Sequence, residues 1–149
     1  MDRFSFEHAL GTIEVSIEHL GACVVVCVSG GDEPHIGSVV LAEARASLTG
    51  EGTSATSSVL NRLGHKDEFV ARTVAETLAA ALNTTVCCIC GIHKDNATPE
   101  DIQACATLGH EIASILLERL APNSSQHRAP SFLFAREQPA NPSTQKGTP

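Results

Sequence analysis

The sequence predicts an α+β fold in which two helices pack on one face of a mostly antiparallel β-sheet. Three observations point to it. In the first 61 residues, apolar and alternating segments follow one another too closely for the crossovers that parallel neighbours need. Two later stretches carry apolar residues at intervals of three and four, as amphipathic helices do. Between them, the unbroken apolar run from Val86 to Ile92 indicates a strand covered on both faces.

Five strands are expected before the first helix. Those at 4–8 and 13–17 alternate apolar with polar side chains, which is typical of half-buried strands. The third, at 22–28, is apolar on both faces. The last two are expected at 36–44 and 53–61, and the richness of the final one in Thr and Ser indicates an exposed edge strand.

The first helix is expected to begin near Asp67 and to end at Asn83, and the second to run from Pro99 to Leu120. A threonine N-cap and a proline in the first helical position favour the second start. Gly109 predicts close packing of the second helix on the first helix or on the sheet. The expected apolar faces are Phe69, Val70, Thr73, Val74, Leu78, Ala81 and Leu82 in the first helix, and Ile102, Cys105, Ala106, Gly109, Ile112, Ala113, Leu116 and Leu120 in the second.

The 149 residues are expected to form one domain over 1–121, followed by a flexible polar tail over 122–149. Prolines and polar residues dominate the tail. Phe132 and Phe134 are its apolar exceptions, and they either stay free or dock on the domain as a short strand.

Composition excludes several classes of partner. The net charge is −7, with no basic block and neither Trp nor Tyr, which argues against nucleic acid. No apolar run approaches the roughly 18 residues that a membrane helix needs. The first residues lack the basic and then apolar pattern of a secretory signal. We therefore expect a cytoplasmic protein that does not interact with membranes.

Six cysteines fall within apolar strands or on a helix face, where a free thiol behaves as a small hydrophobic residue. Cys88 and Cys90 share one face of their strand while Cys87 faces the other way, which makes this group a poor chelate. We expect structural thiols in a reducing compartment, with a metal site or a disulfide as the alternatives.

The central strands are apolar on both faces, but two helices can cover only one of those faces. The sequence therefore predicts a homodimer, in which a second copy covers the other face.

Glycine, histidine and acidic residues recur together in three short segments. These are Gly-Gly-Asp-Glu-Pro-His-Ile-Gly at 30–37, Gly-His-Lys-Asp-Glu at 64–68 and Gly-Ile-His-Lys-Asp-Asn-Ala-Thr-Pro-Glu-Asp-Ile at 91–102. Each lies at an expected strand end or helix start. We expect the three segments to meet.

Three interpretations of His35, His65 and His93 are open. A three-histidine metal site would leave a coordination position free for catalysis. However, the histidines are 30 and 28 residues apart, and no pair lies within one helical turn. In the plainest interpretation each histidine caps a turn or a helix start. The third interpretation is a site for an anionic small molecule, which needs no metal ligand.

The anion site rests on glycines and on a helix start. Gly30, Gly31 and Gly37 allow a ligand to approach the backbone closely, and His65 and Lys66 precede a helix N-terminus, which suits a phosphate. Neither glycine stretch matches a dinucleotide or P-loop fingerprint. No nucleophile elbow or paired-carboxylate motif is present, so we expect no catalytic residue and no stand-alone enzyme.

The three segments resemble, in content and in order, those of the LpdD family, the small D proteins associated with gallate decarboxylase and other UbiD-type decarboxylases. The resemblance covers about residues 5 to 120. It implies a fold similar to that of proteasome-assembly chaperones, paired into a homodimer. It also implies a non-catalytic chaperone that binds reduced prenylated flavin mononucleotide (FMN) as cargo. The client would be an apo UbiD-type decarboxylase, and a flavin prenyltransferase is a candidate partner.

For such a cargo, we expect Lys66 and the helix start to hold the phosphate, with His65 as a donor, while His35, His93 and Asp95 face the flavin ring edges. The full expected cofactor-binding set is Gly30, Gly31, His35, Gly37, His65, Lys66, His93, Lys94 and Asp95.

Other interpretations remain open. In one of them, Lys94 and Asp95 form only a solvated turn. In another, the chain is an accessory or assembly subunit of an aromatic acid decarboxylase, without a ligand of its own. In the last, it is a metal-dependent enzyme that uses His35, His65 and His93.

Overall fold

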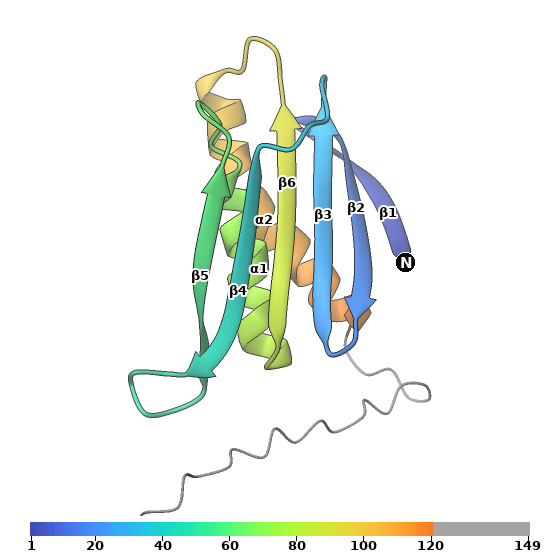
Figure 1. Ribbon diagram of the computed structural model, residues 1–149. Coiled ribbons are helices and arrows are strands. Elements are labelled where there is room, and N and C mark those ends of the chain that lie inside the picture. The colour runs from blue at the N-terminus through green and yellow to red at the C-terminus, as the bar shows by residue number, and fades with distance from the viewer. Residues whose placement is uncertain (121–149) are drawn as a thin grey trace, which may run out of the picture.

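A computed structural model describes residues 1–120, which form six strands and two helices (Figure 1). The elements in chain order are β1 (Asp2–His8), β2 (Gly11–Leu20), β3 (Cys23–Gly31), β4 (Ser38–Ala46), β5 (Thr53–Asn61), α1 (Glu68–Leu82), β6 (Thr85–His93) and α2 (Pro99–Leu120). The predicted tail, with Phe132 and Phe134, lies outside the described residues. The domain boundary at residue 121 therefore stays a prediction.

The six strands form one sheet in the order β1-β2-β3-β6-β4-β5. The pair β3–β6 is parallel, and every other pair is antiparallel. This confirms the α+β class and the antiparallel meander of the first three strands. Because β6 inserts between β3 and β4, the carboxyl ends of β3 and β6 and the start of β4 lie at the same end of the sheet (Figure 1).

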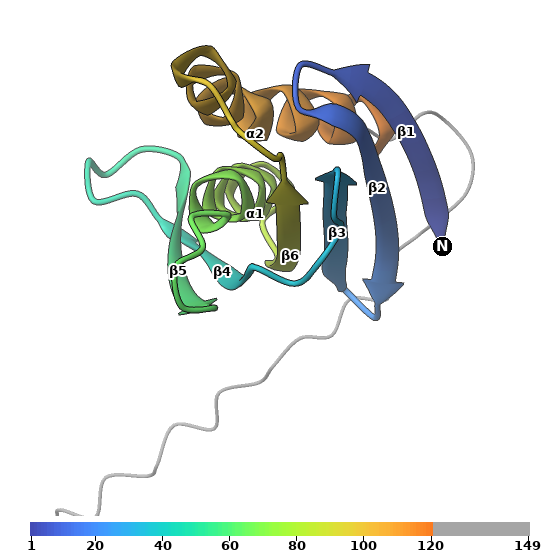
Figure 2. The ribbon, with the colours of Figure 1, turned by 90° about the horizontal axis from the view of Figure 1, so that it is seen from above.

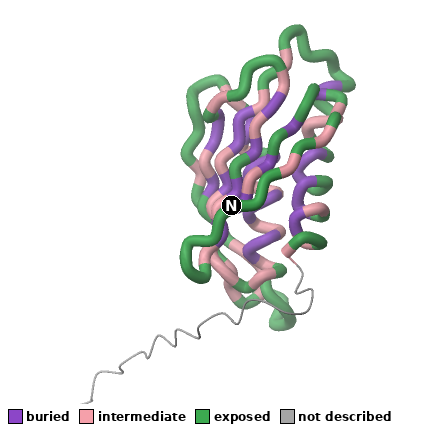
Figure 3. Tube along the Cα trace, turned by 90° about the vertical axis from the view of Figure 1, so that its right-hand side faces the viewer, coloured by how far each residue is buried: buried purple, intermediate pink, exposed green. Residues whose placement is uncertain are grey.

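Both helices cover the same face of the sheet, as predicted (Figure 2). The core between them and the sheet is aliphatic, and its largest fully buried side chains include Ile13, Val26, Leu78, Leu108 and Ile112. Figure 3 shows buried positions on the strands and along the helix sides that face them. No helix within residues 1–120 is long and apolar enough to cross a membrane.

The helix faces differ from the expectation in their details. Phe69 and Ile102 are expected on the apolar faces, but they are 60% and 67% exposed. Ala81 and Ala106 are exposed as well. The buried residues that replace them are Ala71, Ala75 and Ala79 in α1 and Leu108 in α2. Alanines allow a close approach, and α1 buries these three beside Val70, Val74 and Leu78.

The predicted helix ends and the packing glycine are confirmed. Asn83 adopts the left-handed conformation at the end of α1 (φ 51°, ψ 50°), and its N–H donates to the carbonyl of Ala79. Gly109 backs directly onto α1, where an added Cβ would lie 2.9 Å from the Cβ of Thr73. A side chain at residue 109 would therefore push the two helices apart.

The face of the sheet away from the helices carries an apolar strip that crosses β3, β6 and β4. Cys27 and Val39 both pair with Ile89, and Val25 and Leu41 both pair with Cys87. The strip is defined by Val25, Cys27, Val39, Leu41, Cys87 and Ile89, all of which are half-buried or exposed. This is the face that the predicted homodimer would cover, and the homodimer stays a prediction.

Candidate functional site

The three histidine-bearing segments converge at the end of the sheet where β3 and β6 finish (Figure 1). His35 lies in the connection from β3 to β4, His65 in the loop from β5 to α1, and His93 is the last residue of β6. The parallel pairing of β3 with β6 brings these loops together, since it places Gly31 beside His93.

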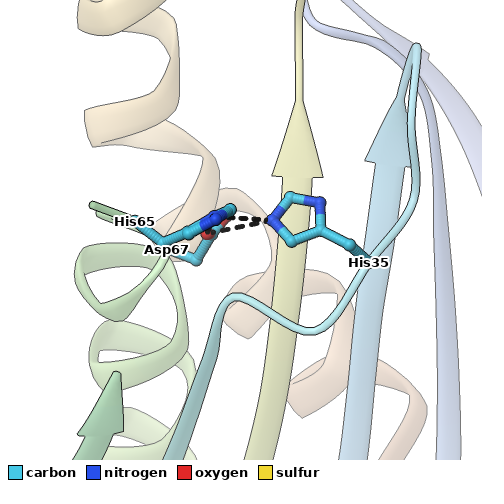
Figure 4. A group of neighbouring side chains, drawn as sticks. All are labelled: His35, His65 and Asp67. Carbon is cyan, nitrogen blue, oxygen red and sulfur yellow. Dashed lines mark hydrogen bonds and ion pairs between the residues drawn. The ribbon is translucent and has the colours of Figure 1, made fainter. Parts of the chain in front are cut away.

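The centre of the site is a cluster of His35, His65 and Asp67 (Figure 4). Nε2 of His35 lies 2.9 Å from Nδ1 of His65. Oδ2 of Asp67 lies 3.5 Å from Nε2 of His35 and 3.4 Å from Nδ1 of His65. The Asp67 side chain is only 8% exposed, so a carboxylate and two imidazoles face one another in a largely dry place.

Contacts outside the cluster determine which atoms face inward. Nδ1 of His35 lies 3.0 Å from the carbonyl oxygen of Glu33 and must donate to it, because a carbonyl only accepts. In the neutral ring, Nε2 is then a bare acceptor, and the N–H at Nδ1 of His65 can donate to it. Oδ1 of Asp67 accepts the backbone N–H of Ile92 at 2.9 Å. The other carboxylate oxygen is thereby left for the imidazoles.

His93 flanks the cluster. Its ring meets that of His35 edge-on, with the centroids 6.2 Å apart. Its Nε2 lies 3.1 Å from Oδ1 of Asp95, and the backbone N–H of Asp95 donates to Oδ2 of Asp32. The His93 side chain is 45% exposed, so it presents a surface that a ligand can reach.

The two lysines of the expected site differ in their surroundings. Nζ of Lys94 donates to the carbonyl of Ala9 and to Oδ1 of Asp101, both at 2.7 Å. Its ammonium group therefore joins the turn between β1 and β2 to the first turn of α2. Lys66 is exposed and makes no side-chain hydrogen bond or ion pair within residues 1–120. Of the two, Lys66 is the free cation beside the start of α1.

The expected glycines pack against the chain itself. An added Cβ would collide at Gly31 with the carbonyl of His93, at Gly37 with the carboxylate of Asp67, and at Gly30, at 2.5 Å, with the carbonyl of Thr12. Gly31 also has a positive φ of 75°. Close approach between segments is therefore reason enough for glycine at these positions, and their contact with a ligand stays a prediction.

Asp67 is the central residue that the sequence did not reveal. It occupies the N-cap position of α1, and sequence reasoning assigned it only to the helix start. Its side chain makes no cap hydrogen bond and instead turns toward the β6 backbone and the imidazoles. The available signal is its place directly after Lys66 and two residues after His65, in one of the three histidine-bearing segments.

The six cysteines are all free thiols in this structure. Cys88 and Cys90 are buried on the helix side of β6, while Cys87 is half-exposed on the other face. Burial raises the pKa of Cys88 and Cys90 well above the ordinary thiol value, and neighbouring thiols and Asp67 raise it further at Cys90. Cys27 is the exception to the expected burial, because it is exposed in the apolar strip.

A hollow of about 390 Å³ lies at the opposite end of the sheet, lined by Met1, Asp2, Ile17, Glu18, His19 and Leu120. It brings no histidine pair, buried carboxylate or helix start together. It also borders Leu120, the last described residue. The convergent chemistry at the carboxyl ends of β3 and β6 is therefore the better indicator of a binding site.

Comparison with known proteins identifies the family. Residues 8–121 match the model of the prenylated flavin chaperone LpdD-like domain. The chain belongs to this family. It is also 26% identical over 141 residues to Protein LpdD from Lactiplantibacillus plantarum (strain ATCC BAA-793 / NCIMB 8826 / WCFS1). That alignment covers 93% of this chain and 99% of the relative.

The match to the LpdD-like domain includes all of the histidine-bearing segments and both helices. The family is described as one of chaperones for prenylated flavin, which suggests that the role is not catalytic and that the cargo is a prenylated flavin.

Proposed function

We propose that this LpdD-like chain binds reduced prenylated FMN as cargo and delivers it to an apo UbiD-type decarboxylase, without catalysing a reaction itself. Membership of the LpdD-like family supports the flavin as ligand. The observation that carries the proposal is the convergence, at one end of the sheet, of a lysine without a side-chain partner in residues 1–120, a helix N-terminus and three histidines.

The phosphate of the cargo is assigned to Lys66 and the start of α1. A flavin phosphate carries a charge of about −2 near neutral pH. The N–H groups of the first helical turn and the positive end of the helix dipole favour an anion there. Within residues 1–120, Nε2 of His65 has no hydrogen-bond partner, so in the tautomer that carries its proton on Nε2 the ring can donate to the same group.

The flavin ring is assigned to the side of His93, with His35 behind it. Reduced flavin offers both N–H donors and carbonyl acceptors along its edge. The imidazole of His93 and the exposed carboxylate of Asp95 can match such groups. The flavin itself supplies all redox chemistry, and the residues of this chain only hold and orient it. A carrier must also release its load, which favours this half-exposed arrangement over an enclosed cavity.

The test is an anaerobic titration of reduced prenylated FMN into the wild-type chain and into Lys66→Glu, at low and high ionic strength. A charge-assisted hydrogen bond contributes roughly 1.5–3 kcal/mol, and each 1.4 kcal/mol is about a factor of ten in affinity. We expect Lys66→Glu to bind at least about tenfold more weakly, with a smaller difference in high salt.

Arg3→Glu is the matched control, because Arg3 is an exposed cation on β1, outside the site. It should bind the cargo as the wild type does. Equal binding by Lys66→Glu and the wild type would place the phosphate elsewhere.

Delivery needs a second experiment. The loaded chain is mixed with an apo UbiD-type decarboxylase, and the recovery of decarboxylase activity is compared with that from free reduced prenylated FMN. Faster or more complete recovery with the loaded chain supports delivery. If the chain binds the decarboxylase but never the flavin, it is instead an accessory or assembly subunit.

A further inference from the structure

We propose that His35, His65 and Asp67 form a binding site for one divalent transition-metal ion of the zinc type. The proposal does not depend on flavin binding. It rests on the meeting of these three side chains in the folded chain. Sequence spacing does not reveal this meeting, because the third residue of the cluster is Asp67 and not His93.

The distances between the three inward-facing atoms match those of a metal site. Zinc binds histidine nitrogen at about 2.0–2.1 Å and carboxylate oxygen at about 2.0–2.2 Å in a tetrahedron, so two of its ligand atoms stand about 3.3–3.4 Å apart. The three separations in the cluster are 2.9, 3.4 and 3.5 Å. A point about 2 Å from all three atoms therefore lies between them.

The surrounding contacts are those that orient metal ligands. A ligating histidine commonly donates its second N–H to a backbone carbonyl, which fixes the tautomer. His35 does this through Nδ1 to Glu33, which turns the lone pair of Nε2 toward the cluster. The carboxylate of Asp67 is held in the same way, by the N–H of Ile92 on Oδ1. His65 ligates through Nδ1 when its proton sits on Nε2.

The electrostatics favour a cation. The side chains of Asp67 and His35 are 8% and 12% exposed. Within the described chain, the only ion-pair partners of Asp67 are the two imidazoles. A buried carboxylate without a full positive charge nearby is costly. A divalent ion between the three ligands supplies that charge.

The site is closed on one side and accessible on another. The backbone of Gly37 backs onto the carboxylate of Asp67 and onto Nε2 of His35, so no side chain intrudes there. The His65 side chain is 25% exposed, which leaves a path for an ion and for a water as fourth ligand. Two imidazoles with one carboxylate suit Zn²⁺, Co²⁺ or Ni²⁺, whereas Mg²⁺ and Ca²⁺ prefer oxygen ligands alone.

The experiment uses the full chain, stripped with a chelator and titrated with ZnCl₂ by calorimetry in the absence of flavin. We expect one zinc per chain, with at least tenfold weaker binding in Asp67→Asn and in His65→Gln. His110→Gln and Cys27→Ser are the controls, because both residues are exposed and lie outside the cluster. Circular dichroism confirms that each variant is folded.

Substitution with Co²⁺ in the wild type makes the test independent of variant folding. Intense visible bands of a tetrahedral ion without a sulfur-to-cobalt charge-transfer band support the proposed nitrogen and oxygen ligands. A strong sulfur band overturns the proposal, and so does the absence of stoichiometric zinc binding. Undiminished binding by folded Asp67→Asn and His65→Gln overturns it as well. Flavin binding is measured separately, so the two proposals can fail independently.

Discussion

The backbone of Gly37 lies directly against the carboxylate of Asp67, so that any side chain at residue 37 would collide with Oδ2. Gly37 comes from the loop before β4, and Asp67 from the loop before α1. Their contact joins two of the three histidine-bearing segments. Asp67 in turn reaches the third segment through the N–H of Ile92. The carboxylate is therefore the common contact of all three.

The first prediction concerns Gly37→Ala. The added methyl group must displace Asp67 or His35, and over-packing of this kind typically costs about 1–3 kcal/mol. We expect a lower unfolding free energy in denaturant titrations. The nitrogen chemical shifts of His35 and His65 should also change, because their contacts with Asp67 are disturbed.

Gly64→Ala is the comparison for this variant. Gly64 has open space around it, and only its positive φ of 81° opposes a side chain. That conformation costs roughly 1–2 kcal/mol in an alanine, but it should leave the imidazole signals of His35 and His65 unchanged. Identical imidazole spectra in Gly37→Ala and the wild type would contradict the contact described here.

The second prediction concerns the two buried thiols. Only the thiolate reacts with alkylating reagents, and burial raises the pKa of Cys88 and Cys90 far above neutral pH. We expect neither residue to be alkylated in the native chain and both to react in denaturant, as peptide mass spectrometry can measure. Replacing either with Ala should cost about 1 kcal/mol of packing and leave flavin binding intact. Loss of binding in a folded variant would give these thiols a functional role instead.

The third prediction is a homodimer formed through the apolar strip of Val25, Cys27, Val39, Leu41, Cys87 and Ile89. Leu41 is 46% exposed in this strip. A charge there would have to be buried in the interface, so Leu41→Glu should be monomeric. Stable interfaces bury about 1,200–2,000 Å² in total, and an open sheet face is a suitable surface for one. Light scattering at micromolar concentration distinguishes the two states.

Cys27 reports on the same interface, because it is exposed in a single copy. It should be alkylated slowly in the wild-type chain and rapidly in Leu41→Glu. Glu14→Gln on the neighbouring strand β2 is a control outside the strip and should remain dimeric. A wild-type chain that scatters light as a monomer would leave the strip without its predicted partner.

The elements of this fold could be predicted because their signals are local. Alternation identifies the strand around Ile13 and Val15, and Asn83 marks a helix end through its own backbone preference. The insertion of β6 between β3 and β4 could not be predicted, because the pairing of Val39 with Ile89 joins residues far apart in the chain. Apolar runs indicate which strands are central, but they do not determine the order of the strands in the sheet.

The candidate site also combines features with local signals and features that depend on contacts between distant residues. Its histidines were recognisable from their setting among glycines at element ends. The direction in which Asp67 points depends on the backbone of Ile92, which is brought near only by the folded sheet. Likewise, Lys66 and Lys94 look equivalent in sequence. Only its contacts with Ala9 and Asp101 distinguish Lys94 from Lys66, whose side chain has no partner within residues 1–120.

The last prediction concerns that contact and its dependence on pH. The hydrogen bond from Lys94 is the main cause that lowers the pKa of Asp101 below its ordinary value, and the backbone N–H of Thr98 adds to it. Because the folded pKa lies below the unfolded one, the stabilisation is fully present above the unfolded pKa, near 4. It is lost as the pH falls through the folded pKa. Asp101→Asn should therefore lower the melting temperature at pH 7 and have progressively less effect below pH 4.

Glu100→Gln provides the control, since Glu100 is an exposed acid in the same first turn of α2 and makes no side-chain ion pair within residues 1–120. Its effect on the melting temperature should be small at every pH, because an exposed charge near a helix start contributes only about 0.3–1 kcal/mol. Melting curves of the wild type and both variants, recorded from pH 7 down to pH 3, separate the two cases. A loss in Asp101→Asn that stays constant over this range would mean that its carboxylate charge does not stabilise the fold. The Asp101 side chain would then act only through the shape of the cap that it forms with Thr98.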